Sequence, residues 1–122
     1  MLSTSHNRAY QDFITLLTNF RNSVIDAERP SNLSQIEPEF EILKQWFEEN
    51  IVSLDPKGIE PAVAPRWQSI QREILREFKL LTTDTLFLFS ARQNSTKTKR
   101  LKSIGDRTTK LIGYCQGLLQ HE

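Results

Sequence analysis

The longest apolar pattern of the chain lies in its second half, between about residues 62 and 92. Its members recur at spacings of three and four: Trp67, Ile70, Ile74, Phe78, Leu81, Thr85 and Leu88. This spacing places them on one face of an α-helix, whereas a half-buried strand would alternate every second residue. The pattern therefore predicts a third helix over 62–92, about 45 Å long, against which the other helices can pack.

The same periodicity predicts three further helices, over 5–26, 38–54 and 96–119. The stripe of the first follows a strict seven-residue repeat: Tyr10, Phe13, Leu17, Phe20 and Val24. The stripe of the second comprises Phe40, Leu43, Phe47, Ile51 and Leu54. The stripe of the fourth comprises Leu101, Ile104, Thr108, Leu111, Ile112, Cys115, Leu118 and Leu119. Each stripe gives its helix one apolar face to bury.

The segments between these helices contain turn-forming residues. Pro30-Ser31-Asn32 predicts a loop, and residues 55–65, with three prolines and a glycine, predict a linker. Pro38 suits the first position of the second helix. Alternatively, the capping-box spacing of Ser34 and Glu37 starts this helix earlier. The connection near 93–95 is so short that the fourth helix must return antiparallel to the third.

These elements predict a single all-α domain spanning residues 1–122, an antiparallel four-helix bundle with a long third helix. A chain of 122 residues buries about two-thirds of its unfolded surface, which is enough for one core. Its apolar runs are too short for a transmembrane segment, and its polar start lacks a signal peptide. We therefore expect a cytoplasmic protein that does not insert into a membrane.

Charge is nearly balanced overall, at +1, but it is unevenly distributed along the chain. Residues 1–61 carry five Lys or Arg and ten Asp or Glu, a net charge of −5. Residues 62–122 carry eleven and five, a net charge of +6. In one interpretation the acidic half docks on the basic half within the bundle. In the other, the basic half presents a surface to an acidic partner.

The sequence predicts no catalytic residue, no metal site and no cofactor. His6 and His121 lie near opposite ends of the chain, where we expect neither to be held as a general base. Cys115, the only cysteine, falls on the apolar stripe of the fourth helix and is expected to be a buried structural thiol. An enzymatic function is therefore the least favoured.

Asp84 is the most unusual polar residue, because it interrupts the most apolar part of the third helix. It can pair with Arg107 or Lys110 of the fourth helix. Alternatively, it belongs to a partner surface with Leu80, Phe87 and Ala91, which share one side of the helix.

Cations cluster at the start of the fourth helix, where the helix dipole disfavours them: Lys97, Lys99, Arg100 and Lys102. Together with Arg92 they form a basic end over residues 92–102. This end can be ordinary solvated surface, a site for an acidic protein, or a nucleic-acid-binding surface. Nucleic acid is the least favoured of these, because no recognition motif accompanies the charge. The candidate partner-binding residues are thus Leu80, Asp84, Phe87, Arg92, Lys97, Lys99, Arg100 and Lys102.

Several short motifs resemble those of the cyanobacterial heterocyst-frequency control protein family, PatD. They are the run 67–74 (Trp-Gln-Ser-Ile-Gln-Arg-Glu-Ile), Leu80-Leu81, Asp84, Phe87-Leu88, Ala91-Arg92-Gln93, Arg100 and the run 111–115 (Leu-Ile-Gly-Tyr-Cys). The resemblance covers most of residues 40–120.

The resemblance implies a small helical regulator of cell division and heterocyst differentiation. Such a protein binds the tubulin-like division protein FtsZ and modulates its assembly into filaments. The resemblance identifies no binding residues. Self-association into a homodimer is a further expectation, because joining filaments requires two binding faces or a dimer with one face each. A nucleic-acid-binding helical module that uses residues 92–102 is the alternative.

Overall fold

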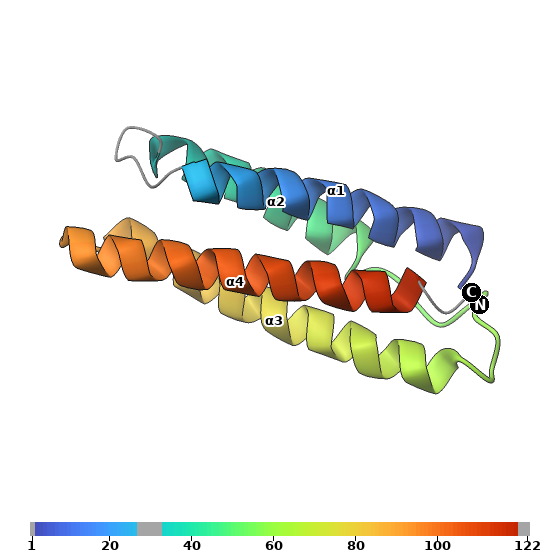
Figure 1. Ribbon diagram of the computed structural model, residues 1–122. Coiled ribbons are helices and arrows are strands. Elements are labelled where there is room, and N and C mark those ends of the chain that lie inside the picture. Colours follow the sequence, from blue (N-terminus) through green and yellow to red (C-terminus); the bar gives the residue numbers. More distant parts are fainter. Residues whose placement is uncertain (1, 27–32, 120–122) are drawn as a thin grey trace.

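The structure, a computed structural model, describes residues 2–26 and 33–119. Its helices are α1 (Thr4–Asp26), α2 (Leu33–Asn50), α3 (Ala64–Ser90) and α4 (Asn94–Leu119). They form one bundle in which α3 is the longest element, at 27 residues. The predicted all-α fold of four helices with a long third helix is confirmed. The colours in Figure 1 run in opposite directions along successive helices, so that α1 begins and α4 ends at the same end of the bundle.

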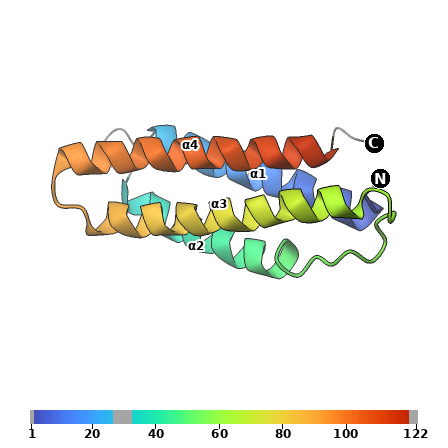
Figure 2. The ribbon, with the colours of Figure 1, turned by 90° about the horizontal axis from the view of Figure 1, so that it is seen from below.

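The four helices do not pack equally closely. α1 packs on both α2 and α4, and α3 packs on α4. Figure 2 shows α3 and α4 side by side along their whole length, joined by a short connection. α2 and α3 approach each other less closely, and stacked phenylalanine rings fill the space between them. The ring of Phe78 on α3 lies 3.9 Å from that of Phe47 and 5.8 Å from that of Phe40 on α2, measured between centroids.

The predicted apolar stripes form the core. Tyr10, Phe13 and Leu17 of α1 are fully buried, as are Leu81 of α3 and Ile104 of α4. The acidic first half does dock on the basic second half, since α1 packs on α4, but it does so through apolar side chains. Within the described residues, the ion pairs that join two helices all connect α3 with α4. The two halves are therefore held together by apolar packing, and no ion pair between described residues of these helices joins them.

Both predicted ends of the second helix are wrong. α2 begins at Leu33, ahead of both proposed starts, and Pro38 lies inside the helix. The physical reason is Ile36, which is fully buried and extends the apolar stripe back by one turn. At the other end, the helix stops at Asn50, because Val52 donates to the carbonyl of Phe47, a bond across five residues that widens the last turn.

The other boundaries differ by one or two residues. α1 begins one residue before the prediction, α3 spans Ala64–Ser90 in place of 62–92, and α4 begins at Asn94 in place of 96. Arg92 therefore lies beyond α3, after Ala91, whose extended backbone ends the helix. The predicted linker is confirmed as irregular chain over residues 55–63, where Gly58 adopts a φ of +85°, whereas Ala64 and Pro65 belong to α3. The predicted loop at 30–32 and His121 lie outside the described residues.

His6 is held firmly, contrary to the prediction. Its side chain is 5% exposed, and its Nε2–H donates to the backbone carbonyl of Asp55 at 2.8 Å. Its Nδ1 accepts a hydrogen bond from the hydroxyl of Ser3, which also accepts from the backbone N–H of His6 at 3.1 Å and so caps α1. Nε2 thus fastens the linker to the start of α1, and the bond of Nδ1 to Ser3 orients the ring.

We expect Leu81→Ala and Ile104→Ala each to lower the free energy of unfolding by about 2–5 kcal/mol, because each leaves a cavity in the core. Urea melts monitored by circular dichroism measure the loss. Ile42→Ala is the matched control, because Ile42 is 67% exposed and should change stability by no more than about 0.5 kcal/mol. Losses near the control value at both core positions would contradict the packing of α3 on α4.

Candidate functional site

Two carboxylates of α3 are buried against α4. Glu77 is 2% exposed and Asp84 is 4% exposed. Their separation of seven residues, two helical turns, places both on the side of α3 that faces α4. A buried carboxylate is stable only when cations and hydrogen-bond donors surround it, so this pair requires partners from the neighbouring helix.

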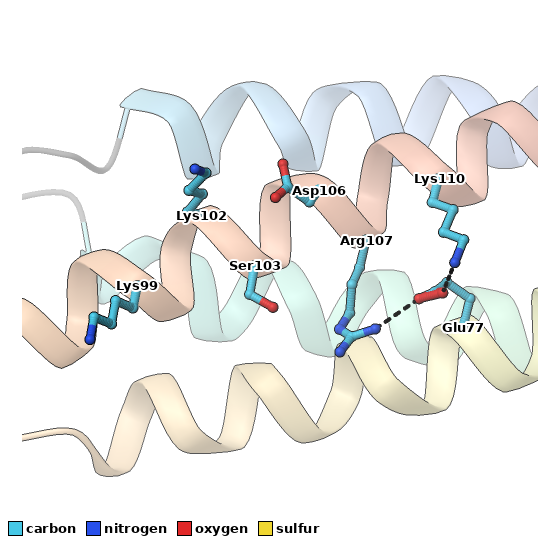
Figure 3. Close-up of a pocket in the computed structure, with 7 residues that line it drawn as sticks. All are labelled: Glu77, Lys99, Lys102, Ser103, Asp106, Arg107 and Lys110. Carbon is cyan, nitrogen blue, oxygen red and sulfur yellow. Dashed lines mark hydrogen bonds and ion pairs between the residues drawn. The ribbon is translucent and has the colours of Figure 1, made fainter.

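α4 supplies these partners, and Arg107 is the central one. Its Nη1 lies 3.0 Å from Oε2 of Glu77, and its Nε donates to Oδ2 of Asp84. Nζ of Lys110 forms a second ion pair with Glu77, 3.3 Å from its Oε1, and Figure 3 shows Lys110 approaching Glu77 beside Arg107. Arg100 contacts Asp84 at 3.1 Å. Ser103 donates a further hydrogen bond of 2.7 Å to Asp84.

The environment of Asp84 favours its ionised form. Burial by itself raises the pKa of this carboxyl group. The hydrogen bonds from Ser103 and Arg107, together with the positive charges of Arg107 and Arg100, outweigh burial and hold the pKa of Asp84 below its usual value. The hydrogen bond between Arg107 and Asp84 in turn raises the pKa of Arg107. Asp84 therefore contributes a fixed negative charge to the interior at neutral pH.

This geometry decides between the two interpretations of Asp84. The predicted pairing with α4 is confirmed, with Arg107 as one partner, whereas Lys110 pairs with Glu77. The placement of Asp84 on an exposed partner surface is wrong, because α4 covers it. Glu77 was missed by the sequence reasoning. The signal that could have found it is the matched spacing of seven residues in Glu77 and Asp84 and in Arg100 and Arg107.

Leu80 and Phe87 lie outside the core, as predicted, with exposed fractions of 36% and 49%. Two neighbours that were not predicted join them: Leu86 is 61% exposed and Phe89 is 37% exposed. We call Leu80, Leu86 and Phe87 the apolar face of α3; Phe89, nine residues after Leu80, lies about half a turn away on the opposite side of the helix. The guanidinium of Arg100 lies 4.6 Å from the centre of the Phe87 ring, a cation–π contact that fixes one edge of this face.

The remaining predicted cations surround the connection between α3 and α4. Arg92, Lys99 and Lys102 are exposed, and Lys97 is half-buried. None of the four forms an ion pair with another described residue. Arg100 differs from them, since its charge is directed at Asp84. We call residues 80–102 the hairpin end, which thus combines exposed apolar side chains with cations that are not neutralised.

A shallow depression of about 410 Å³ lies along α4 beside the buried carboxylates (Figure 3). Its lining residues are Glu77, Lys99, Lys102, Ser103, Asp106, Arg107 and Lys110. The inner cations, Arg107 and Lys110, are directed at Glu77, while Lys99 and Lys102 lie toward the hairpin end. This depression is the solvent-facing side of the ion-pair network, in which Arg107 and Lys110 already have acidic partners, whereas Lys99 and Lys102 have none among the described residues.

The other reactive groups do not converge on a chemical site. Cys115 is fully buried, as predicted, and burial raises its pKa to about 12, so the thiol stays protonated at neutral pH. Tyr10 accepts from Trp67 at 2.8 Å and donates to Gln71 at 2.6 Å. Over residues 2–26 and 33–119, no group of three His, Cys, Asp or Glu side chains is placed to hold a metal ion.

Comparison with known proteins finds no relative. No protein-family model matches the chain, and neither a curated protein nor a solved structure matches it. The resemblance of its motifs therefore stays a prediction. In the part of the chain that the structure describes, no helix has both the length and the apolar character needed to cross a membrane.

We expect Arg107→Ala to lower the free energy of unfolding by about 3 kcal/mol, because it removes a charge shared by two buried carboxylates. Arg76→Ala is the matched control. Arg76 pairs with Glu73 on the surface of α3, where the side chains are 61% and 42% exposed. Such a pair contributes about 0–1 kcal/mol. Equal losses in the two variants, measured in urea, would show that the network does not stabilise the α3–α4 contact.

The low pKa of Asp84 predicts loss of stability in acid. In an unfolded chain an aspartate titrates near pH 4. The stabilisation from the lowered folded pKa is therefore complete above about pH 4 and disappears as pH falls through that folded value. We expect the free energy of unfolding to fall less steeply over this acid range in Asp84→Asn than in the unmodified chain. Parallel pH profiles of the two proteins would contradict the assignment.

Proposed function

We propose that this protein is a non-enzymatic regulator of cell division and heterocyst differentiation that binds FtsZ and modulates its assembly. It would act in the cytoplasm, where its binding partner assembles. Two lines of support lead to this proposal. One is the resemblance of its motifs to the PatD family, and the other is the character of the hairpin end.

The observation that carries the proposal is the combination of apolar and basic groups at the hairpin end. Leu86 and Phe87 are 61% and 49% exposed, although other apolar residues of α3 already form its buried face. Arg92, Lys97 and Lys99 lie close to them in the chain and have no acidic partner among the described residues. Exposed apolar groups beside unpaired charge are typical of surfaces that bind proteins.

The motifs that carry the resemblance divide into two groups by burial. Trp67, Ile74 and Cys115 are buried and therefore describe the fold. Phe87 and Arg92 are exposed and lie at the hairpin end. The second group is the one that can account for a shared partner, since residues that are buried in the core are not available to contact another protein.

A protein partner is favoured over nucleic acid by the same residues. Cations such as Lys97 and Lys99 strengthen binding to a phosphate backbone, but an exposed leucine such as Leu86 adds little to that binding. Burying an exposed leucine or phenylalanine against a protein contributes about 1.5–3 kcal/mol. The nucleic-acid-binding module is thus the alternative outcome of the test below.

We expect this protein to pellet with FtsZ filaments assembled with GTP. The triple variant Arg92→Glu, Lys97→Glu and Lys99→Glu should lose most of this co-pelleting. Arg100 is left unchanged, because reversing its charge would break the ion pair with Asp84. The matched control is the variant Lys57→Glu, Arg66→Glu and Arg72→Glu, which changes the net charge equally at exposed positions away from the hairpin end.

Three results are informative. Co-pelleting lost only in the first triple variant supports the proposal. Equal loss in both triple variants indicates an effect of overall charge and contradicts a site at the hairpin end. Absence of co-pelleting by the unmodified protein at physiological salt rejects FtsZ as the partner, and a shift of labelled DNA or RNA under the same conditions then selects the alternative.

A further inference from the structure

We propose that the apolar face of α3 is the docking site for an acidic amphipathic helix of the partner protein. Its apolar residues would cover Leu86 and Phe87, and its carboxylates would face Arg92, Lys97 and Lys99. This inference deepens the proposed function and rests on it, because it states the chemistry by which the hairpin end recognises its protein partner.

The solvent side of α3 changes character at Lys79. Before this point Arg72, Arg76 and Lys79 are exposed and keep the helix surface polar. From Leu80 to Ser90 the only charged residue is Asp84, which is buried. These eleven residues form about three helical turns, about 16 Å of helix, so the uncharged strip is short. A strip of this length is matched by about three turns of a single helix lying along α3.

The strip has a fixed anchor at the edge next to α4. The Phe87 ring lies against the guanidinium of Arg100, and Arg100 in turn is held by its ion pair with Asp84 at 3.1 Å. The ring therefore needs little additional ordering when a partner binds. Anchors that are ordered in advance contribute more to affinity, because less side-chain entropy is lost.

The charge around the strip selects an acidic partner. No Asp or Glu occurs between Thr85 and Gly105, while five cations do. Arg100 is neutralised by Asp84, which leaves the other four to attract carboxylates. A second copy of the chain would bring the same cations to the contact, and like charges oppose each other there. Charge complementarity thus favours an acidic helix over self-association.

An anionic membrane would also attract these cations, but the arrangement of the apolar residues fits it less well. The residues of the connection itself, Ala91-Arg92-Gln93, include no large apolar side chain that could enter a bilayer. Figure 1 shows α2 beginning at the same end of the bundle, and there Glu37 and Glu41 are exposed. Their charges would be repelled by anionic lipid. A helix lying along α3 is smaller than a membrane surface, so it can meet Arg92, Lys97 and Lys99 without covering α2.

The test uses the full-length ¹⁵N-labelled protein and two synthetic helical peptides. One peptide has leucines at spacings of three and four and glutamates elsewhere, and the control has lysines in place of the glutamates. We expect the acidic peptide to shift amide resonances between Leu80 and Lys99, and the basic peptide to leave them unchanged. Leu86→Gln should weaken binding of the acidic peptide by about tenfold or more. The matched variant Ile42→Gln, at an exposed apolar position on α2, should not.

Failure of this inference and failure of the proposed function give different results. If Leu86→Gln and Ile42→Gln both retain FtsZ pelleting and the acidic peptide does not bind, the docking site is wrong and the proposed function stands. If the peptide binds at the hairpin end but FtsZ never pellets, the site stands and the proposed partner is wrong. Sedimentation with phosphatidylglycerol vesicles that Leu86→Gln abolishes, without peptide binding, would overturn the proposal in favour of a membrane surface.

Discussion

The contact between α3 and α4 depends on the neutralisation of two buried carboxylates by one arginine. Glu77 and Asp84 are separated by two helical turns, and the guanidinium of Arg107 reaches both. Shifting α4 along α3 by a single turn would leave at least one carboxylate buried without this partner, at a cost of several kcal/mol. The network therefore fixes the register of the two helices, which apolar side chains alone specify less strictly.

This register also positions the surface at the hairpin end. Arg100 and Arg107 are two turns apart on α4, matching the two carboxylates, so the pairing of Arg107 brings Arg100 to Asp84. From there the guanidinium of Arg100 also reaches the Phe87 ring. The far side of the bundle is organised differently, by the stacked rings of Phe47 and Phe78, whose bulk keeps α2 at a greater distance from α3.

The sequence was sufficient for the helices and most of their buried faces, because three-four periodicity is a local property that each helix carries by itself. It was insufficient where a residue's environment depends on another element. The burial of Glu77 requires Arg107 and Lys110 from α4, and the fixing of His6 requires the carbonyl of Asp55 from the linker. The candidate site was predicted in part: Phe87 and its neighbouring cations are at the surface, whereas Asp84 is not.

Arg100 is the residue at which stability and the proposed binding surface meet. Its ion pair with Asp84 belongs to the buried network, and its contact with Phe87 belongs to the exposed apolar face. Its side chain is 37% exposed, so a partner could reach one side of the guanidinium while the other neutralises Asp84. We therefore expect any change at Arg100 to alter both folding and the proposed recognition. The two contributions can be separated at Arg107, which pairs with the buried carboxylates, and at Leu86, whose side chain projects into solvent. By this division the interior network sets the shape of the hairpin end, and in the proposed function the exposed residues would set what it binds.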